Sequence, residues 1–157
     1  MENVMQLRGE THAWHWRRQP SRLTQVCIVT DDSVTDTFEE ALVAWLGNSP
    51  QVALLHLYDP ATAHAEWLAT RECSETRPRK LENALEKAID PLPRDCRLLL
   101  CSVDVAALEW LGGVVGQRVF FTHYRPDANQ QRQLAAMIGT MEDALRASLT
   151  EKWGDSY

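Results

Sequence analysis

Acidic residues stand directly after apolar segments of this sequence. Asp31 and Asp32 follow one such segment, and Asp104 follows a later one. Carboxylate oxygens are ligands that suit Mg²⁺, and a carboxylate can also act in acid–base chemistry or accept a phosphoryl group. These residue types therefore predict one candidate site, a divalent-metal or phosphate-linked site at Asp31, Asp32 and Asp104.

Helix capping is the competing interpretation of the same residues. An aspartate that ends a strand is also a common N-cap of the following helix, as expected for Asp59 before Pro60. Only the Asp31-Asp32 pair exceeds what capping requires, because adjacent carboxylates repel unless they are solvated or bound to a cation. A metal site predicts that Asp31 or Asp32 converges with Asp104 in an open cleft. Capping predicts that each carboxylate points to its own helix.

The order of these residues resembles that of response-regulator receiver domains. Asp31-Asp32 follows one apolar strand, Asp104 a later strand and Thr122 the next. This resemblance implies a phosphate-linked site with Mg²⁺. The sequence departs from the receiver pattern because the stretch between the second and third strands is longer, and because no fifth strand with a lysine follows.

A second resemblance concerns the turn after the first apolar strand. The motif Asp31-x-Ser33-x-Thr35 resembles the first metal-binding motif of von Willebrand A domains. This resemblance implies a divalent metal, with Thr70 or Thr76 and Asp104 as later ligands. The sequence departs from that family in its short first helix.

Other signatures of catalysis are absent from the sequence. It contains no G-x-G-x-x-G after the first apolar strand, no G-x-x-x-x-G-K-[ST] and no G-x-S-x-G. The turn after that strand has no glycine, which disfavours a close approach of the backbone to a phosphate. We therefore expect a non-catalytic protein-binding or regulatory module, acting as a subunit or adaptor of a larger assembly. An enzymatic role stays open.

Residues 1–22 differ from the rest of the chain. This arm lacks sustained periodicity and is rich in Trp and Arg, with Trp14, Trp16, Arg17 and Arg18 close together. One interpretation is an edge strand that covers the core, with both tryptophans on one face at spacing two. The other is a docking segment for another protein, since Trp and Arg are favoured interface anchors.

Apolar strands and amphipathic helices alternate four times over residues 23–157. Strands are expected over 23–30, 51–58, 97–103 and 118–123, each followed by a helical pattern. After the second strand two helices are expected, over about 61–69 and over 81–89. This alternation predicts a three-layer α/β/α sandwich of the Rossmann-like or flavodoxin-like kind. Its sheet should be mostly parallel with about four strands, and the arm can add an edge strand. Ligands of such sheets bind beyond the carboxyl ends of the strands, which is where the acidic residues lie.

The first helix is expected to bury one clean face. That face consists of Phe38, Ala41, Leu42, Trp45 and Leu46. We expect Trp45, Trp67 and Trp110 to pack onto the sheet, and His56 to be a satisfied histidine inside the second strand. Gly139 lies within the last helical pattern, where it predicts a bend or a close approach.

Bulk composition limits the function classes. The chain has 157 residues and a formal net charge of −6, which suits one domain and disfavours nucleic acid or an anionic membrane as partner. Cys27, Cys73, Cys96 and Cys101 form no C-x-x-C pair, so we expect reduced thiols in a cytoplasmic protein without zinc. No segment has the length of a membrane span. We expect no cofactor apart from Mg²⁺ under the alternative, and a homo-oligomer is compatible with the sequence.

Overall fold

The computed structural model describes residues 14–76 and 84–153. The first thirteen residues of the predicted arm and the first three of the helix expected over 81–89 lie outside these ranges. The described elements, in chain order, are β1 (Trp14–Arg18), β2 (Val26–Asp31), α2 (Asp36–Leu46), β3 (Val52–Leu57), α3 (Pro60–Thr76), α4 (Ala84–Ile89), β4 (Arg97–Ser102), the 3₁₀ helix η1 (Val105–Leu111), α5 (Gly112–Val115), β5 (Val119–His123) and α6 (Gln130–Trp153).

One five-stranded sheet forms the centre of this α/β fold, in the order β1-β3-β2-β4-β5. The four strands predicted after residue 22 are parallel to their neighbours. The arm supplies β1, which pairs antiparallel with β3. The sheet is therefore mixed rather than mostly parallel, because this fifth strand runs against the others. The expected edge strand in the arm is present.

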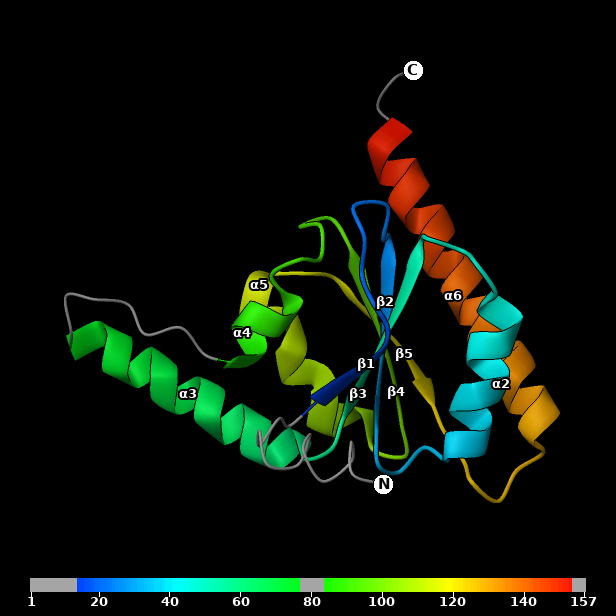
Figure 1. The fold of residues 1–157 in the computed structure, drawn as a ribbon, viewed down its shortest axis with the longest axis horizontal. Helices are drawn as coiled ribbons and strands as arrows, with labels where there is room; N and C mark the ends of the chain where they lie inside the picture. Colours follow the sequence, from blue (N-terminus) through cyan, green and yellow to red (C-terminus); the bar gives the residue numbers. More distant parts are fainter. Residues whose placement is uncertain (1–13, 77–83, 154–157) are drawn as a thin grey trace, which may run out of the picture.

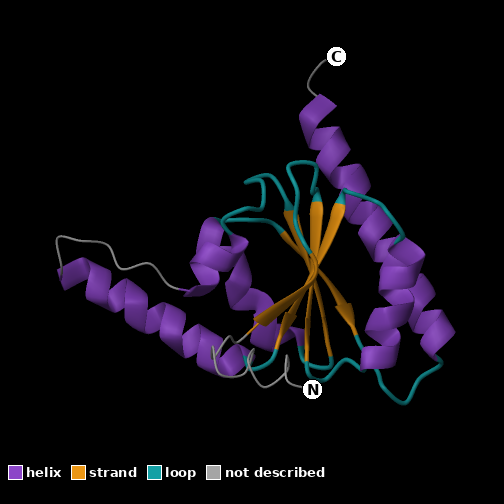
Figure 2. Cartoon of the chain, in the orientation of Figure 1, coloured by secondary structure: helices purple, strands orange, loops and turns teal. Residues whose placement is uncertain are grey.

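Helices lie on both sides of the sheet (Figure 1). In this view α2 and α6 lie on one side, and α3, α4 and α5 lie on the other. The strands fan out between them with a strong twist (Figure 2). Every residue of β2, β3 and β4 is buried, as expected for parallel strands covered on both faces.

Two apolar clusters, one on each face, hold these layers together. Alternate residues of the central strands point to opposite faces. Ile28 and Leu54 therefore join Phe38 and Leu42 of α2 in one cluster, with Met137 of α6. The other cluster combines intervening strand residues with side chains of α4 and η1: Val29, Leu55, Leu100, Leu85, Ile89 and Leu108.

The strand order creates a topological switch point between β2 and β4. The chain passes from β2 to β3 on one side and places β4 on the other side of β2. The loops after β2 and β4 therefore leave the sheet next to each other and lead to opposite faces. Open α/β sheets bind ligands at this position, so the residues of these two loops are the first candidates for a site.

The first helix is rotated relative to the sequence prediction. Its buried residues are Phe38, Glu39, Leu42 and Leu46. Trp45 does not pack onto the sheet, because 51% of its surface is exposed. The inner face instead contains the carboxylate of Glu39, which is 0% exposed. Trp67 is buried and Trp110 partly buried on the opposite side of the sheet.

The ends of the helices agree with the sequence prediction only in part. Thr35 caps α2, accepting a hydrogen bond from the Phe38 amide. Asp59 accepts bonds from Thr62 at the start of α3, as a capping aspartate should, and these bonds lower its pKa. That helix continues to Thr76 instead of ending near residue 69. The described part of α6 runs through Gly139 as one helix, and a Cβ there would meet no atom within 4 Å. The predicted close approach is therefore absent.

The cysteines with described side chains are free and buried. Cys27, Cys96 and Cys101 form no disulfide. Burial raises the pKa of Cys96 and of Cys101 to about 12, so both thiols stay protonated. Within residues 14–76 and 84–153, no helix combines the length and apolar character that a membrane crossing requires.

Candidate functional site

Asp31 joins the two loops at the switch point. It is the last residue of β2, and its carboxylate is mostly buried. One carboxylate oxygen accepts hydrogen bonds from the backbone amide of Ser33, at 2.9 Å, and from the Ser33 hydroxyl. The other accepts a bond from the hydroxyl of Ser102, at the end of β4, at 2.6 Å. Both oxygens of Asp31 are thus engaged within the protein.

The two serines complete this connection. Their hydroxyl oxygens lie 3.2 Å apart. The Val103 amide donates to Ser33 at 3.0 Å, and the Asp104 amide donates to Ser102 at 3.0 Å. The loops after β2 and β4 are therefore held together by hydrogen bonds where the fold would place a ligand crevice. We call Asp31, Ser33 and Ser102 the switch-point cluster.

A second polar cluster lies under the first turns of α2. Glu39 points inward to meet Thr30 of β2 and His56 of β3, which are register partners in the sheet. The Thr30 hydroxyl donates to Glu39, and the Glu39 carboxylate lies 2.9 Å from Nδ1 of His56. Thr30, Glu39 and His56 are all buried. Buried charge of this kind is tolerated only when paired and hydrogen-bonded.

His56 is held between two carboxylates. Its Nε2 atom lies 2.7 Å from Asp32, whose side chain is 64% exposed. Burial alone would lower the pKa of His56, but the hydrogen bonds to Glu39 and Asp32 and the charges of both carboxylates raise it above 6.5. The protonated imidazolium donates from both ring nitrogens. A histidine engaged in this way has no nitrogen left to act as a general base.

Arg17 extends this cluster to the arm. Its guanidinium lies 3.4 Å from the second oxygen of Glu39 and 3.9 Å from Asp36. That Glu39 oxygen accepts no hydrogen bond, so the charge of Arg17 offsets the cost of burying it. Glu39 thus receives positive charge from both β1 and β3. We call Thr30, Glu39, His56, Asp32 and Arg17 the Glu39 cluster.

The three predicted metal ligands have separate surroundings. Asp31 belongs to the switch-point cluster, whereas Asp32 turns to His56 in the Glu39 cluster. Asp104 makes no side-chain cap for the helix after it. Among residues 14–76 and 84–153, no three His, Cys, Asp or Glu side chains form a group that could hold a metal ion. The capping interpretation also fails for Asp31 and Asp32, because Thr35 caps α2.

The four arm residues singled out from the sequence contact the domain itself. Trp14 and Trp16 pack on the face that carries the η1 and α4 cluster. Arg17 pairs with Glu39. Arg18 donates to the carbonyl oxygens of Val52 at 3.1 Å and Gly47 at 2.7 Å, and also to Ser49. This arrangement is what the interpretation of the arm as a cover predicts; docking of another protein through these residues stays a prediction.

Sequence reasoning missed the roles of Glu39 and Ser102. The signal for Glu39 was present, because Glu39, Leu42 and Leu46 follow the spacing of one helix face. A glutamate on that face indicates a buried partner, and His56 lies at the end of the next strand. The interpretation of His56 as a satisfied core histidine is confirmed. Nothing in the sequence around Ser102 indicated its bond to Asp31.

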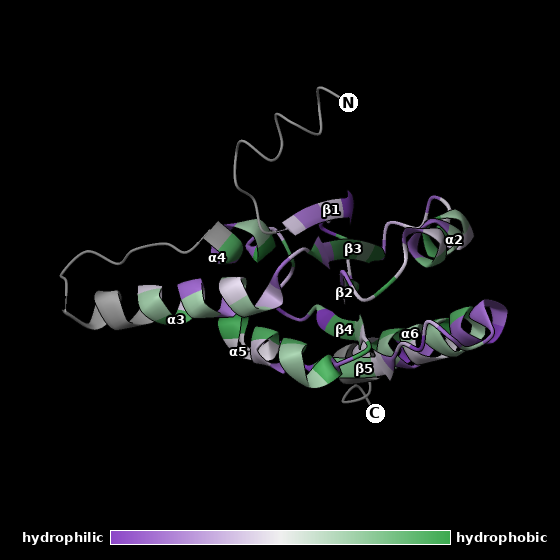
Figure 3. Ribbon diagram, turned by 90° about the horizontal axis from the view of Figure 1, so that it is seen from below, coloured by the Kyte–Doolittle hydropathy of each residue, from purple (hydrophilic) through white to green (hydrophobic). Residues whose placement is uncertain are grey.

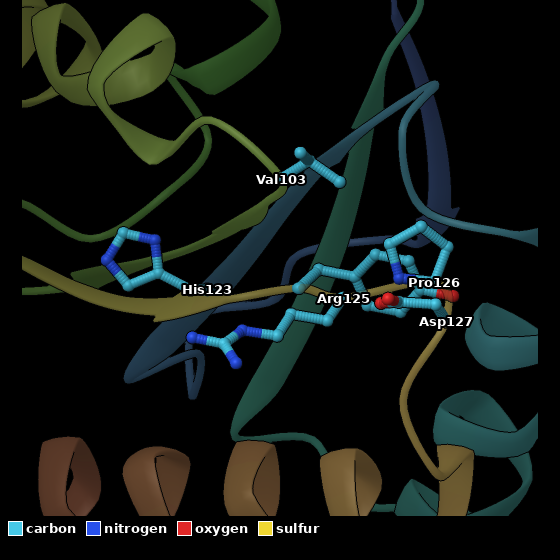
Figure 4. A pocket seen from close by; sticks show the side chains of 6 residues that line it. Val103, His123, Arg125, Pro126 and Asp127 are labelled. Atoms are coloured by element: carbon cyan, nitrogen blue, oxygen red, sulfur yellow. The ribbon is translucent and has the colours of Figure 1, made fainter.

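An open cavity of about 420 Å³ lies at the end of β5 (Figure 4). Figure 4 shows the His123 ring and the Arg125 guanidinium extending toward one side, with Asp127 toward the other. The full lining consists of Val103, His123, Tyr124, Arg125, Pro126 and Asp127. Arg125 and His123 thus line one side of this cavity, and the carboxylate of Asp127 lines the other.

Comparison with known proteins does not assign a family. No protein-family model matches the sequence, and no curated protein matches it. The chain is similar to one solved structure, the crystal structure of sigma-54 interaction domain protein from Enterococcus faecalis. The identity is 13% and the TM-score 0.38, over 87% of this chain and 95% of that one. A likeness this low says nothing about function.

Proposed function

We propose that this chain is a non-catalytic protein-binding or regulatory module, a subunit or adaptor of a larger assembly. The observation that carries the proposal is a pair of aromatic side chains that are more than half exposed. Trp45 of α2 is 51% exposed and Phe121 of β5 is 52% exposed. Aromatic residues are enriched in protein interfaces because they offer a large apolar area at a low cost in side-chain entropy.

The polar side chains at the carboxyl ends of the strands are already hydrogen-bonded within the protein, and this supports the same proposal. The oxygens of Asp31 and the ring nitrogens of His56 are bound by neighbouring side chains. These groups would have to give up those bonds before they could take part in a reaction. Their arrangement fits a role in fixing the loops and the arm of an open, doubly wound sheet of the flavodoxin-like kind, whose strand order the four parallel strands follow.

The proposed module acts on proteins in the cytoplasm. The free, buried cysteines fit a reducing compartment, and the net charge of −6 disfavours nucleic acid. Association of two copies is compatible with this function. Within the arm, docking through Trp14 and Trp16 would compete with their packing on the domain, so the surfaces that carry the exposed Trp45 and Phe121 are better supported.

Cross-linking capture tests the proposal. The purified full chain is immobilised, exposed to lysate of its source and cross-linked, and the retained proteins are quantified. Trp45→Gln and Phe121→Thr are compared with Glu40→Gln, an exposed neighbour of Trp45 on α2. We expect a reproducible partner whose yield falls with at least one aromatic substitution and is unchanged by the control. A chain that retains no protein contradicts the proposal.

Deleting the whole arm is unsuitable for this test. Residues 14–18 form β1, and their removal would uncover β3 and the charge of Glu39. A loss of binding after that deletion would report damage to the fold. Deletion of residues 1–13 leaves β1 intact and tests the remainder of the predicted docking segment.

A second candidate is the divalent-metal or phosphate-linked site. The convergence of oxygen atoms from Asp31, Ser33 and Ser102 favours it, since hard cations take such ligands. Asp104 would then serve from the loop after β4, and Asp32 would have to give up its bond to His56 to serve from the loop after β2. A bound metal should raise the melting temperature with the logarithm of its concentration. Asp31→Asn and Asp32→Asn should weaken that response, and no shift with millimolar Mg²⁺ or Mn²⁺ contradicts this candidate.

A further inference from the structure

β1 and β5 form the two opposite edges of the sheet (Figure 3), and these edges differ in how well they are protected from pairing with another strand. At the β1 edge the register shifts between Trp16 and Arg18, two arginines lie within the strand, and Pro20 follows it. Irregular register, charge and proline are the devices by which proteins prevent another strand from pairing. The five residues of β5 at the other edge contain no proline and no Lys, Arg, Asp or Glu, and their pairing with β4 is regular.

The outer side of β5 presents unpaired backbone groups. The carbonyl of Arg118 accepts from Leu98, and the amide of Tyr124 donates to Ser102, so the even-numbered residues face β4. Backbone groups alternate along a strand. The N–H and C=O groups of Val119, Phe121 and His123 therefore point away from the sheet. Within the described part of the chain they have no hydrogen-bond partner.

The side chains at this edge add apolar area and positive charge. Phe121 is exposed and lies edge-on to His123, with ring centroids 5.8 Å apart. His123 and Arg125 then line the cavity at the end of the strand (Figure 4). The sequence has 22 acidic residues, yet none occurs between Glu109 and Asp127. Asp127 lies on the other side of the cavity, so the end of β5 beside Arg125 is locally basic on an acidic protein.

We propose that the outer edge of β5 binds an extended segment of a partner protein, which adds a sixth strand and carries acidic residues at the end that meets His123 and Arg125. Strand addition supplies backbone hydrogen bonds, and alternate side chains supply specificity. An apolar side chain of the segment packs on Phe121, and a carboxylate enters the cavity beside Arg125. The proposal rests on the proposed protein-binding function and names its surface and the chemistry of its partner.

Charge argues against a second copy as the occupant. Each chain carries a net charge of −6, so two copies repel over most of their surface. A two-fold pairing of β5 with itself would also bring Arg118 and Arg125 of one copy, which flank the strand, close to those of the other. An acidic segment has the opposite sign, and complementary charge accelerates association and selects partners.

Peptide selection tests this proposal with full-length protein. The probe is a phage-displayed library of random twelve-residue peptides. Enriched peptides should alternate apolar residues and end in one or more acidic residues, and their synthetic versions should bind the protein with an affinity that falls as salt rises. Peptides enriched without acidic residues overturn the proposal.

Two variants locate the binding. Phe121→Pro removes an outward amide without removing a bond to β4, because only the even-numbered residues pair with that strand. Arg125→Glu reverses the charge while leaving the backbone bonds between Arg125 and Gln133 available. Each should raise the dissociation constant about tenfold or more. Arg146→Glu, the same charge change on α6, should alter it less than about twofold.

The results distinguish a failure of the β5 assignment from a failure of the protein-binding function on which it rests. If cross-linking captures a partner whose yield is unchanged by Phe121→Pro and Arg125→Glu, the β5 assignment is wrong and the protein-binding function stands. If neither peptide nor partner is retained, both are wrong. A dimer in sedimentation that Phe121→Pro dissociates overturns the acidic partner in favour of a second copy. Arg125→Glu keeps the test decisive if Phe121→Pro does not fold.

Discussion

Glu39 is the residue on which the carboxyl edge of the sheet depends. Its fully buried carboxylate meets Thr30, His56 and Arg17, which come from β2, β3 and β1. One side chain of α2 thus connects the helix to three strands, including the strand that the arm adds. Removing its charge would leave two cationic groups without their main partner.

We predict that Glu39→Gln lowers the free energy of unfolding by about 3 kcal/mol, because removing one partner of a buried ion pair leaves the others uncompensated. Glu40→Gln is the matched control, since Glu40 is exposed on the same helix, and it should stay within about 0.5 kcal/mol of the parent. Urea denaturation of both variants measures the difference. Equal free energies of unfolding for the two variants would contradict a stabilising role of the Glu39 ion pairs.

The raised pKa of His56 makes stability depend on pH. A histidine whose pKa is higher in the folded state binds its proton more tightly there, so protonation favours folding. This contribution is fully present below the unfolded pKa of about 6.5 and is lost as pH rises through the folded pKa. We predict that the free energy of unfolding falls over that window, and that His56→Gln removes this fall. Melting curves at a series of pH values check it, and parallel profiles for both proteins would refute it.

Among individual residues, the sequence predicted where the polar side chains lie along the strands better than which side chains they contact. The acidic residues after the strands were found, and His56 was correctly interpreted. The predicted orientation of α2 was wrong because the spacing of its apolar residues placed Trp45 on the inner face, whereas Trp45 is exposed. The ion pairs of Glu39 outweigh the preference of Trp45 for burial. Such pairs join residues from separate strands, and spacing along the chain does not reveal them.

At the scale of elements, Arg18 fixes the turn that follows α2. Its guanidinium donates to carbonyl oxygens of Gly47, Ser49 and Val52. These carbonyls lie at the end of α2 and the start of β3, where backbone acceptors lack helical partners. An arginine donates several such bonds at once from a planar fork, which lysine does not reproduce.

We predict that Arg18→Lys lowers the free energy of unfolding by about 1 to 2 kcal/mol, through the loss of one or two hydrogen bonds from a charged donor. Arg22→Lys, an exposed arginine outside the strand, is the control and should be neutral. Hydrogen exchange at residues 47–52 should also accelerate in the Arg18 variant alone. Unchanged exchange there would contradict this role.

Two glycines should respond to alanine in opposite directions. A Cβ at Gly112 would lie 2.6 Å from a methyl group of Val119 and 3.3 Å from the carbonyl of Gln117. We predict that Gly112→Ala costs about 1 kcal/mol or more through overpacking. Gly139→Ala should stabilise α6 by up to about 1 kcal/mol, because its Cβ meets no atom within 4 Å. Thermal melts of both variants measure the direction of each change in melting temperature. A change in the same direction for both would contradict the packing described.

Element boundaries were predicted best where apolar periodicity is strong. The strands after residue 22 follow that rule. The extension of α3 to Thr76 was missed, since its polar second half shows no apolar face. Its length comes from uninterrupted backbone hydrogen bonding. The antiparallel direction of β1 was also undetermined, because alternation of Trp14 and Trp16 gives the face of a strand and says nothing about its direction.

At the scale of the whole molecule, the sheet has one protected edge and one open edge. The arm closes the first, through the register shift in β1 and the pairing of Arg17 with Glu39. The outer groups of β5 and the ring of Phe121 remain available at the second. The polar residues at the switch point hold the loops, whereas the surface that can receive a partner lies at the sheet edge. This division could not be predicted from the sequence, because it depends on strand order.

The most direct test of this division compares two variants in one quantitative cross-linking capture from source lysate. Asp32→Asn alters the predicted acidic site, and Phe121→Pro alters the open edge. We predict that the Asp32 variant retains the same partner at the yield of the parent chain, while the Phe121 variant loses it. Loss of the partner from the Asp32 variant, with full retention by the Phe121 variant, would contradict this division.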